Sequence, residues 1–270
     1  MQKQKFTDQM GREIEINFPP KRIISLVPSQ TELLFDLGLT NEIAGITKFC
    51  IHPKDKFKLT TKIGGTKKLD IEKIKSLKPD LIIGNKEENE HQQIEELVKH
   101  FPAWMSDILN LSDAKQMIEK VGELVNKREE ALVICSQIKN DFEKLEKSLV
   151  GITPKPTAYF IWKNPNMLAG KQTFINEMLS YCGLKNVFEL NRYPEISDEE
   201  LKKLKPEVVL LSSEPYPFKA KHIEEFKIIW PNTKIKLVDG EMFSWYGSRL
   251  LRAADYFENL HVNLFLKNHL

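Results

Sequence analysis

The segment LDIEKIKSLKPDLII (residues 69–83) aligns without a gap with ISDEELKKLKPEVVL (residues 196–210). Glutamate, lysine, leucine, lysine and proline coincide. In both segments an acidic first turn opens a short helix, which stops before an X-Pro pair and leads into an apolar strand. A second, weaker similarity in the same order pairs residues 32–39 with residues 177–184. Two pairs of similar segments that occur in the same order predict a duplicated α/β unit.

Strands and amphipathic helices alternate on both sides of a long helical stretch. The alternation covers residues 23–105 and resumes at residue 157, which predicts mostly parallel sheets. Between them, apolar residues recur at helical spacing, with Gly122 the only weak helix former and Ser112 the expected N-cap. We expect an α/β protein of two similar Rossmann-like lobes that enclose a cleft. The expected parts are an N-terminal lobe (1–111), one long connecting helix (112–150) and a C-terminal lobe (151–270), whose last helix covers about residues 246–266.

Composition narrows the class of protein. The 270 residues include 40 Lys plus Arg and 38 Asp plus Glu, so the net charge of +2 argues against a dedicated nucleic-acid binder. No apolar stretch approaches the roughly 18 to 20 residues of a membrane helix, and the first residues show no secretory signal. Three cysteines favour reduced thiols over a disulfide framework.

Catalytic motifs are missing from the sequence. Gly-x-Ser-x-Gly, His-Glu-x-x-His and Gly-x-Gly-x-x-Gly do not occur. Residues 165–173 depart from a phosphate loop, because Pro165 stands where the first glycine belongs and Gln172 follows Lys171. We therefore expect binding rather than catalysis, and no intrinsic cofactor.

Several of these segments together resemble a known family. RIISLVPSQTE (residues 22–32), residues 77–83, the long helix and the turn at residues 169–171 resemble the helical-backbone substrate-binding proteins of ABC importers. Within that family the chain is most similar to binders of vitamin B12 and related corrinoids, beside those of ferric siderophores and haem. The resemblance implies capture of a metal-chelate ligand in the cleft, delivery to an ABC permease dimer, and a location in the periplasm or cell envelope. We expect a monomer.

The ligand site is expected to be aromatic at its centre and polar at its rim, because corrinoids and porphyrins present a broad apolar face edged by polar groups. By position, the resemblance implies contacts at Phe49, Met167, Tyr193, Glu241 and Trp245. Packing at the rim of the core is the alternative for each aromatic residue. The predicted ligand contacts are Pro28, Ser29, Phe49, Thr66, Asn85, Trp162, Met167, Tyr193, Glu241, Trp245 and Tyr246.

Three of these contacts depart from the B12 binders, and two others open a helix. Thr66 and Asn85 stand where those binders have Trp, and Trp245 replaces a basic residue, so a ferric siderophore or haem is an alternative ligand. Pro28 and Ser29 start a helix whose free amides could hold a carboxylate or phosphate. N-capping by Ser29 is the other interpretation.

Acids at equivalent positions of the two repeats predict a second function. The resemblance implies that Glu72 and Glu199 dock into arginine pockets on the two permease subunits; stabilisation of a helix dipole is the alternative. We predict no free-metal site, with His52 as the one candidate axial ligand to a metal already held by its macrocycle. The competing hypothesis is a cytoplasmic corrinoid or cofactor carrier, or a cofactor-related enzyme on the same fold.

Overall fold

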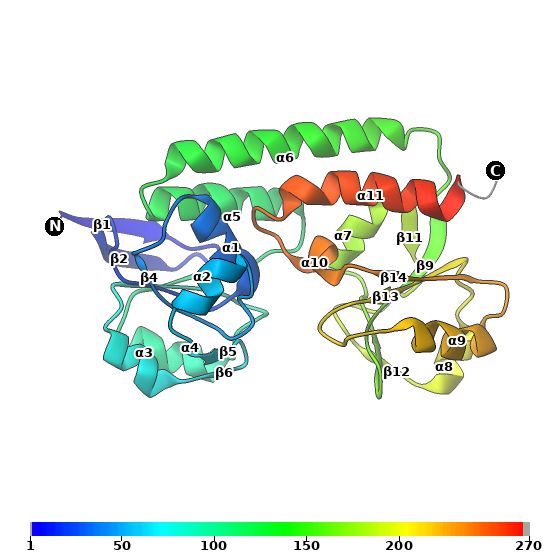
Figure 1. Cartoon of the computed structure of the whole chain (residues 1–270), viewed down its shortest axis with the longest axis horizontal. Coiled ribbons are helices and arrows are strands. Elements are labelled where there is room, and N and C mark those ends of the chain that lie inside the picture. The colour runs from blue at the N-terminus through cyan, green and yellow to red at the C-terminus, as the bar shows by residue number, and fades with distance from the viewer. Residues whose placement is uncertain (1, 267–270) are drawn as a thin grey trace. The chain divides into compact units, whose positions relative to one another are not determined.

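Residues 2–266 are described by a computed structural model (Figure 1), so residue 1 and residues 267–270 of the predicted lobes lie outside the described residues. Internal contacts divide the chain into two units. Unit 1 runs to Gln137 and also includes Tyr246–Arg249, whereas unit 2 comprises Ile138–Trp245 and the residues from Leu250 onward.

A four-stranded parallel sheet forms the centre of unit 1, in the order β4-β3-β7-β8. Every residue of β3, β7 and β8 is buried, which explains why these strands appear in the sequence as continuous apolar runs. The strands are β3 (Ile23–Ser25), β4 (Ile43–Ile46), β7 (Leu81–Asn85) and β8 (Ala103–Ser106), with a two-stranded ribbon of β5 (Gly64–Gly65) and β6 (Lys68–Leu69). The helices wholly within this unit are α1 (Pro28–Asp36), α2 (Lys54–Leu59), α3 (Ile71–Leu77), α4 (His91–Val98) and α5 (Leu111–Leu124).

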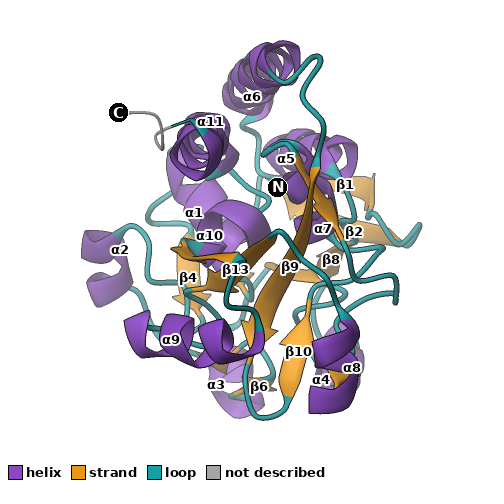
Figure 2. Ribbon diagram, turned by 90° about the vertical axis from the view of Figure 1, so that its right-hand side faces the viewer, coloured by secondary structure: helices purple, strands orange, loops and turns teal. Residues whose placement is uncertain are grey.

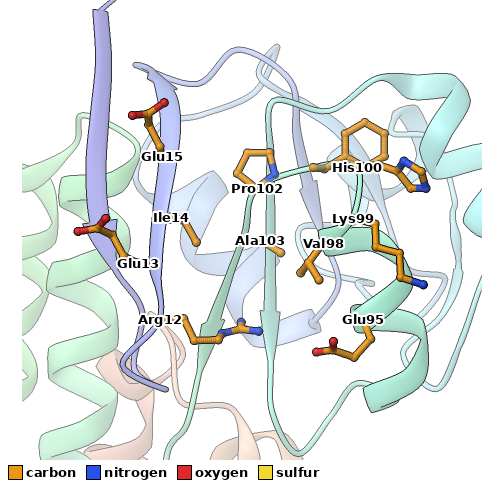
Figure 3. Close-up of a pocket in the computed structure, with 11 residues that line it drawn as sticks. Arg12, Glu13, Ile14, Glu15, Glu95, Val98, Lys99, His100, Pro102 and Ala103 are labelled. Carbon is orange, nitrogen blue, oxygen red and sulfur yellow. The ribbon is translucent and has the colours of Figure 1, made fainter.

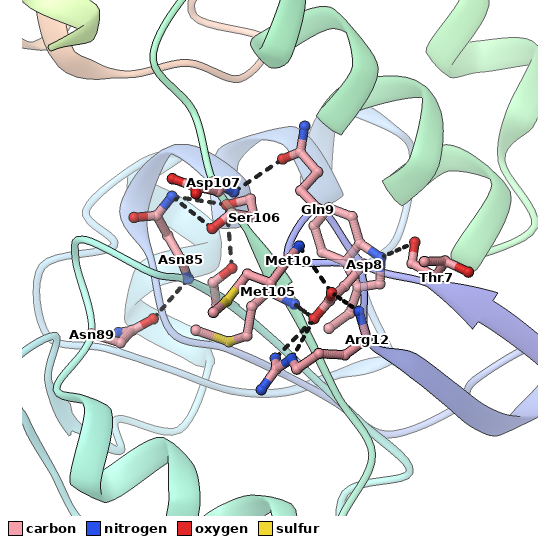
Figure 4. Close-up of polar contacts among 12 residues, drawn as sticks. Thr7, Asp8, Gln9, Met10, Arg12, Asn85, Asn89, Met105, Ser106 and Asp107 are labelled. Carbon is pink, nitrogen blue, oxygen red and sulfur yellow. Dashed lines mark hydrogen bonds and ion pairs between the residues drawn. The ribbon is translucent and has the colours of Figure 1, made fainter. Parts of the chain in front are cut away.

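An N-terminal hairpin of β1 (Gln2–Thr7) and β2 (Glu13–Phe18) covers part of the outer edge of β8. The Gln9 amide donates to the Met105 carbonyl at 3.1 Å, and the Trp104 indole donates to the Thr7 carbonyl at 3.4 Å. Asp8 accepts the Met105 amide in the same place (Figure 4). These bonds occupy backbone groups that an edge strand otherwise leaves open to pairing with another chain.

A six-stranded sheet forms the centre of unit 2. Its order is β12-β10-β9-β13-β14, and β11 pairs with the first residues of β9. Figure 2 shows β9, the longest strand of this sheet, together with β10 and β13. The strands are β9 (Lys155–Trp162), β10 (Asn166–Leu168), β11 (Leu184–Asn186), β12 (Glu195–Ile196), β13 (Val208–Ser212) and β14 (Lys234–Val238). The helices wholly within this unit are α7 (Phe174–Ser180), α8 (Asp198–Lys203), α9 (Ala220–Ile229), α10 (Gly240–Ser244) and α11 (Leu250–Phe265).

The two sheets repeat one topology. The parallel order β4-β3-β7-β8 corresponds to β11-β9-β13-β14, and the α3-β7 step corresponds to α8-β13. Gly38 follows α1 with φ 86° and Gly183 follows α7 with φ 67°, a left-handed conformation that glycine adopts at little cost. The predicted α/β class with two similar units is confirmed.

The prediction of one helix over residues 112–150 is wrong. The stretch contains α5 and α6 (Arg128–Ser148), separated by a turn in which Asn126 has φ 58°. Gly122 permits the tight turn, because a Cβ there would lie 2.3 Å from the Cβ of Ala131. The residue that looked like a weak helix former thus lies at a close contact between α5 and α6, two helices that Figure 1 labels.

The long helix that leads from one unit to the other is α6 alone. Its 21 residues span about 31 Å at 1.5 Å per residue, and the division of the chain falls inside it, after Gln137. The cap of α5 also differs from the prediction, since Asn110, and not Ser112, accepts the Asp113 amide at 2.9 Å.

The prediction of a final helix over residues 246–266 is wrong at its beginning. The segment Tyr246–Arg249 is not helical and lies against α1 of unit 1, so α11 begins only at Leu250. None of the helices within residues 2–266 combines the length and the apolarity needed to cross a bilayer.

Candidate functional site

Unit 1 has a topological switch point between β3 and β7. The chain leaves β3 through α1 toward β4, and leaves β7 through α4 toward β8 on the other side. Ligands of open α/β sheets bind at such points, outside the carboxyl ends of the strands. Buried polar residues gather there, and we call them the polar edge: Ser25, Ser29, Gln30, Thr31, Thr47, Asn85, Asn89 and Ser106.

Hydrogen bonds join the polar edge into a network. Gln30 Nε2 donates to Ser106 Oγ at 2.6 Å and to the Gly84 carbonyl at 3.2 Å. Asn85 Nδ2 donates to the same Ser106 Oγ at 2.9 Å (Figure 4), and its Oδ1 accepts the amides of Glu87 and Glu88. Asn85, predicted to contact ligand, is therefore buried and ties the ends of β7 and β8 together.

Ser29 occupies the second position of α1 and does not cap it. The N-cap position belongs to Val27, and Pro28 takes the first helical position, where a missing N–H costs nothing. The N-capping interpretation of Ser29 is therefore wrong. Within residues 2–266, Ser29 Oγ and Gln30 Oε1 are buried without a hydrogen-bond partner. Because such atoms are rare, the polar edge retains hydrogen-bonding capacity that its own residues do not use.

Phe49 and Thr66 lie beside the polar edge. Phe49 is 50% exposed and covers Gly65, where a Cβ would lie 3.0 Å from its ring. The Thr66 carbonyl accepts from Asn89 Nδ2 at 3.2 Å. The structure thus brings four predicted residues of unit 1, Ser29, Phe49, Thr66 and Asn85, to one end of its sheet.

Cys50 belongs to the same end of the sheet but is not a reactive thiol. Its Sγ lies 3.1 Å from the hydroxyls of Thr31 and Thr47, and burial raises the pKa of the thiol. His52 follows in the same loop. No group of three or more His, Cys, Asp or Glu within the described residues is placed to hold a metal ion. All three cysteines are buried and free.

Unit 2 presents aromatic residues where unit 1 presents polar ones. We call Trp162, Met167, Tyr216, Phe243 and Trp245 the aromatic edge. Trp162 is 38% exposed and pairs with Met167 across the β9–β10 hairpin. The ring of Tyr216 meets that of Trp162 edge-on at 5.5 Å, and the Tyr216 amide donates to the Ile161 carbonyl.

Glu214 organises the buried part of this edge, and sequence reasoning missed it. Glu214 Oε1 accepts from Trp245 Nε1 at 3.0 Å and from Ser244 Oγ at 2.7 Å. Trp245 is only 5% exposed. Two further predicted residues belong to unit 2. The Glu241 amide donates to Asp239 Oδ1 at 3.1 Å. Tyr193 lies in a loop whose Pro194 carbonyl accepts the Leu168 amide.

Tyr246, the last predicted contact, lies in a segment of unit 1 that we call the strap, Tyr246–Arg249. Arg249 grips Glu32 of α1 with two bonds, Nε to Oε2 at 2.9 Å and Nη2 to Oε1 at 2.8 Å. Both side chains are buried. Burial raises the pKa of Glu32, and Asp36 adds to the rise, whereas Arg249 and His52 oppose it. No motif in the sequence indicated this pair.

The two acids predicted to dock a permease occupy matching places. Glu72 is the second residue of α3, and Glu199 is the second residue of α8. The residues aligned before them, Asp70 and Ser197, cap the two helices. Both acids are exposed, the Glu72 side chain by 85%.

A groove of about 590 Å³ elsewhere on unit 1 contains none of the predicted contacts. It lies between β2 and the carboxyl end of α4, over the beginning of β8 (Figure 3). Its lining mixes acids and bases, including Glu13, Glu95 and Lys99. The groove is therefore separate from the residues that sequence reasoning selected.

Comparisons with known proteins agree on one family. The sequence pattern of the family described as periplasmic binding protein matches residues 23–227. An uncharacterized ABC transporter substrate-binding lipoprotein of Bacillus subtilis is 28% identical over 92% of this chain and 82% of its own length. A vitamin B12-binding protein of Photorhabdus laumondii is 27% identical over 87% of this chain and 86% of its own.

Two solved structures share the fold with equal TM-scores of 0.78. The periplasmic vitamin B12 binding protein BtuF of Vibrio cholerae is 21% identical and covers 91% of this chain and 98% of its own. The periplasmic haem-binding protein BhuT, solved with two haems, is 20% identical and covers 90% of this chain and 98% of its own. At these identities the likeness concerns the fold alone, and the fold is compatible with different ligands.

Proposed function

Because this chain belongs to the periplasmic binding protein family, we propose that it captures a corrinoid or another metal chelate and delivers it to an ABC import permease. The family and the similar proteins are substrate-binding transport proteins, so the protein is a binding protein and not an enzyme. The names of the two relatives, a B12-binding protein and an ABC transporter lipoprotein, support the ligand class and the permease.

The exposed aromatic group of Trp162 and Tyr216 is the observation that carries the proposal. Trp162 leaves 38% of its surface exposed while Tyr216 supports its ring edge-on. An indole held in this way offers a broad, rigid apolar surface, and stacking on such a surface suits the flat face of a macrocycle. Met167, opposite Trp162 in the hairpin, adds an adaptable apolar contact.

The identity of the chelate depends on the polar edge. Asn85 is buried and engaged, and Thr66 contributes a backbone carbonyl to the network, so neither supplies an indole surface of the kind the resemblance places there. A corrinoid is our first candidate, and a ferric siderophore or haem is the alternative. The unused capacity of Ser29 and Gln30 suits a ligand with hydrogen-bonding groups at its rim.

Titration calorimetry with cobalamin, cobinamide, haemin and a ferric siderophore tests the proposal. We expect heat from at least one corrinoid, and a monomer by light scattering of the same samples. Heat from haemin or the siderophore alone would replace the ligand class, and no heat from any of the four would overturn the function.

Delivery is proposed to depend on Glu72 and Glu199. Their equal places in α3 and α8 suit a permease with one binding pocket on each of two subunits. The double variant Glu72→Gln/Glu199→Gln is expected to bind ligand normally but to lose transport in cells. Glu129→Gln is a matched control, because the Glu129 side chain is also 85% exposed in the first turn of a helix. Normal transport by the double variant would rule out the docking role.

A further inference from the structure

The strap is unusual because its contacts and its chain neighbours belong to different units. Tyr246–Arg249 belongs to unit 1 by its contacts, although the residues directly before and after it belong to unit 2. A segment of four residues that leaves its surroundings in the chain needs strong local anchors, and besides the Tyr246 ring, which is only 6% exposed, it has few apolar atoms to bury.

Three contacts anchor the strap to one face of α1. Arg249 holds Glu32 with two bonds of 2.9 and 2.8 Å, and the two side chains are only 5% and 7% exposed. Ser248 Oγ donates to Asp36 Oδ2, one helical turn further along. At the other end of α1, Gly247 approaches the Ser29 carbonyl so closely that a Cβ would lie 2.5 Å from the oxygen.

These anchors place two predicted ligand residues together. Gly247 lies against Ser29, and Tyr246 directly precedes Gly247, so the position of Tyr246 depends on the grip of Arg249 on α1. The bidentate geometry matters, because two parallel bonds fix the direction of the guanidinium as well as its distance. We propose that Glu32 and Arg249 are a positioning pair that holds Tyr246 and the first turn of α1 in the geometry that binds ligand.

The affinity part of this inference rests on the proposed function, whereas the anchoring part does not. Two variants loosen the strap by different means. Arg249→Met removes the grip, and Gly247→Ala drives a methyl group into the Ser29 carbonyl. We expect faster hydrogen exchange at the strap amides in both variants and about tenfold weaker binding of the corrinoid that the wild type binds. Arg128→Met, which loses two exposed ion pairs of unit 1, is the control and should change neither.

A second comparison separates positioning from stability. Arg249→Met leaves the Glu32 carboxylate buried without its partner, which destabilises the fold. Glu32→Gln in the Arg249→Met background removes that charge, so stability should recover while binding stays weak. In a Tyr246→Ala background, loosening the strap should weaken binding less than it does in the wild type, because only the first turn of α1 is then left to position.

Each result decides the inference. Affinity that recovers together with stability in the Glu32→Gln/Arg249→Met double variant would overturn the positioning role. The role would also be overturned if the loss of affinity from loosening the strap added in full to the loss from Tyr246→Ala. Unchanged exchange of the strap amides in a folded Gly247→Ala protein would overturn the anchoring. Should the wild type bind none of the chelates, the proposed function fails, while the exchange measurement still decides whether the pair anchors the strap.

Discussion

The sheets of units 1 and 2 share a strand order but differ at their carboxyl edges. In unit 1 the chain passes from β3 into α1 within three residues, so a helix start and a hydrogen-bonded network occupy the edge. In unit 2, β9 continues into a hairpin with β10, and α7 begins only at Phe174. The hairpin removes the helix start from the edge and leaves room for aromatic side chains. The two units thus share a backbone topology while their edges carry different chemistry.

Phe243→Ala tests whether the inner part of the aromatic edge is core. Phe243 is fully buried, with its ring 5.0 Å from Tyr159 and 4.9 Å from Phe257. We expect a loss of about 3–5 kcal/mol in the free energy of unfolding, measured with denaturant. Ile228→Ala, at a side chain that is 83% exposed, should change it by less than about 0.5 kcal/mol. Equal effects would mean that this edge is not packed as described.

Ser106→Ala tests the polar edge in the same way. Its hydroxyl accepts from Gln30 Nε2 and from Asn85 Nδ2, so its loss removes the shorter bond of each buried amide and leaves only the longer bonds to the Gly84 and Ser106 carbonyls. The expected cost is about 1–3 kcal/mol, smaller than that of Phe243→Ala because little volume is lost. Ser76→Ala, at an exposed hydroxyl, is the control. If Ser106→Ala lowered the free energy of unfolding as much as Phe243→Ala, the polar edge and the aromatic edge would not differ in stability as proposed.

Trp162→Ala and Phe49→Ala compare the exposed aromatic residues of the two units in binding. Each should weaken ligand binding by about 1–2 kcal/mol, with little change in unfolding, because both rings are substantially exposed. Leu59→Ala, 85% exposed on α2, should leave calorimetric affinity unchanged. An effect confined to one of the two rings would assign the ligand's apolar face to one unit.

The smallest effect on the free energy of unfolding is expected at Glu96 on α4, whose ion pairs are exposed at the surface. Hydrogen bonds from Lys75 and Lys99 lower the pKa of Glu96 to about 2. A lowered pKa means that the contribution is complete above the ordinary value of 4.5 and is lost as the pH falls toward 2. Glu96→Gln should therefore unfold slightly more easily than wild type at pH 6, and the two should become equal only once the pH falls below the pKa of Glu96. The difference should shrink in high salt, because the pairs are exposed.

The repeat, the parallel sheets and the matching places of Glu72 and Glu199 could be predicted because they leave local patterns in the sequence. The Lys-Pro step after Leu77 and after Leu204 favours a helix end through the local backbone alone. The break at Asn126 escaped prediction because the spacing of apolar residues continues across it. The decisive fact, the approach of Gly122 to Ala131, depends on two helices having already packed.

The site residues divide in the same way. Aromatic residues at strand ends, such as Trp162, could be selected from the sequence because their positions follow from the strands. Glu214 and Arg249 could not, since their roles arise from partners far away in the chain, Trp245 and Glu32. Asn85 was selected by position, yet its burial and its bond to Ser106 depend on the neighbouring strand.

The grip of Arg249 on Glu32 also limits how this protein can be dissected. A fragment that ends after Gln137 would retain the sheet and the hairpin of the first half but would lack Arg249. Its Glu32 would then have to take up a proton, reach solvent or strain the helix that carries it. Expression of the halves as separate polypeptides therefore requires grafting the strap sequence onto the first, and a permuted chain that keeps the strap intact is the better starting point for engineering.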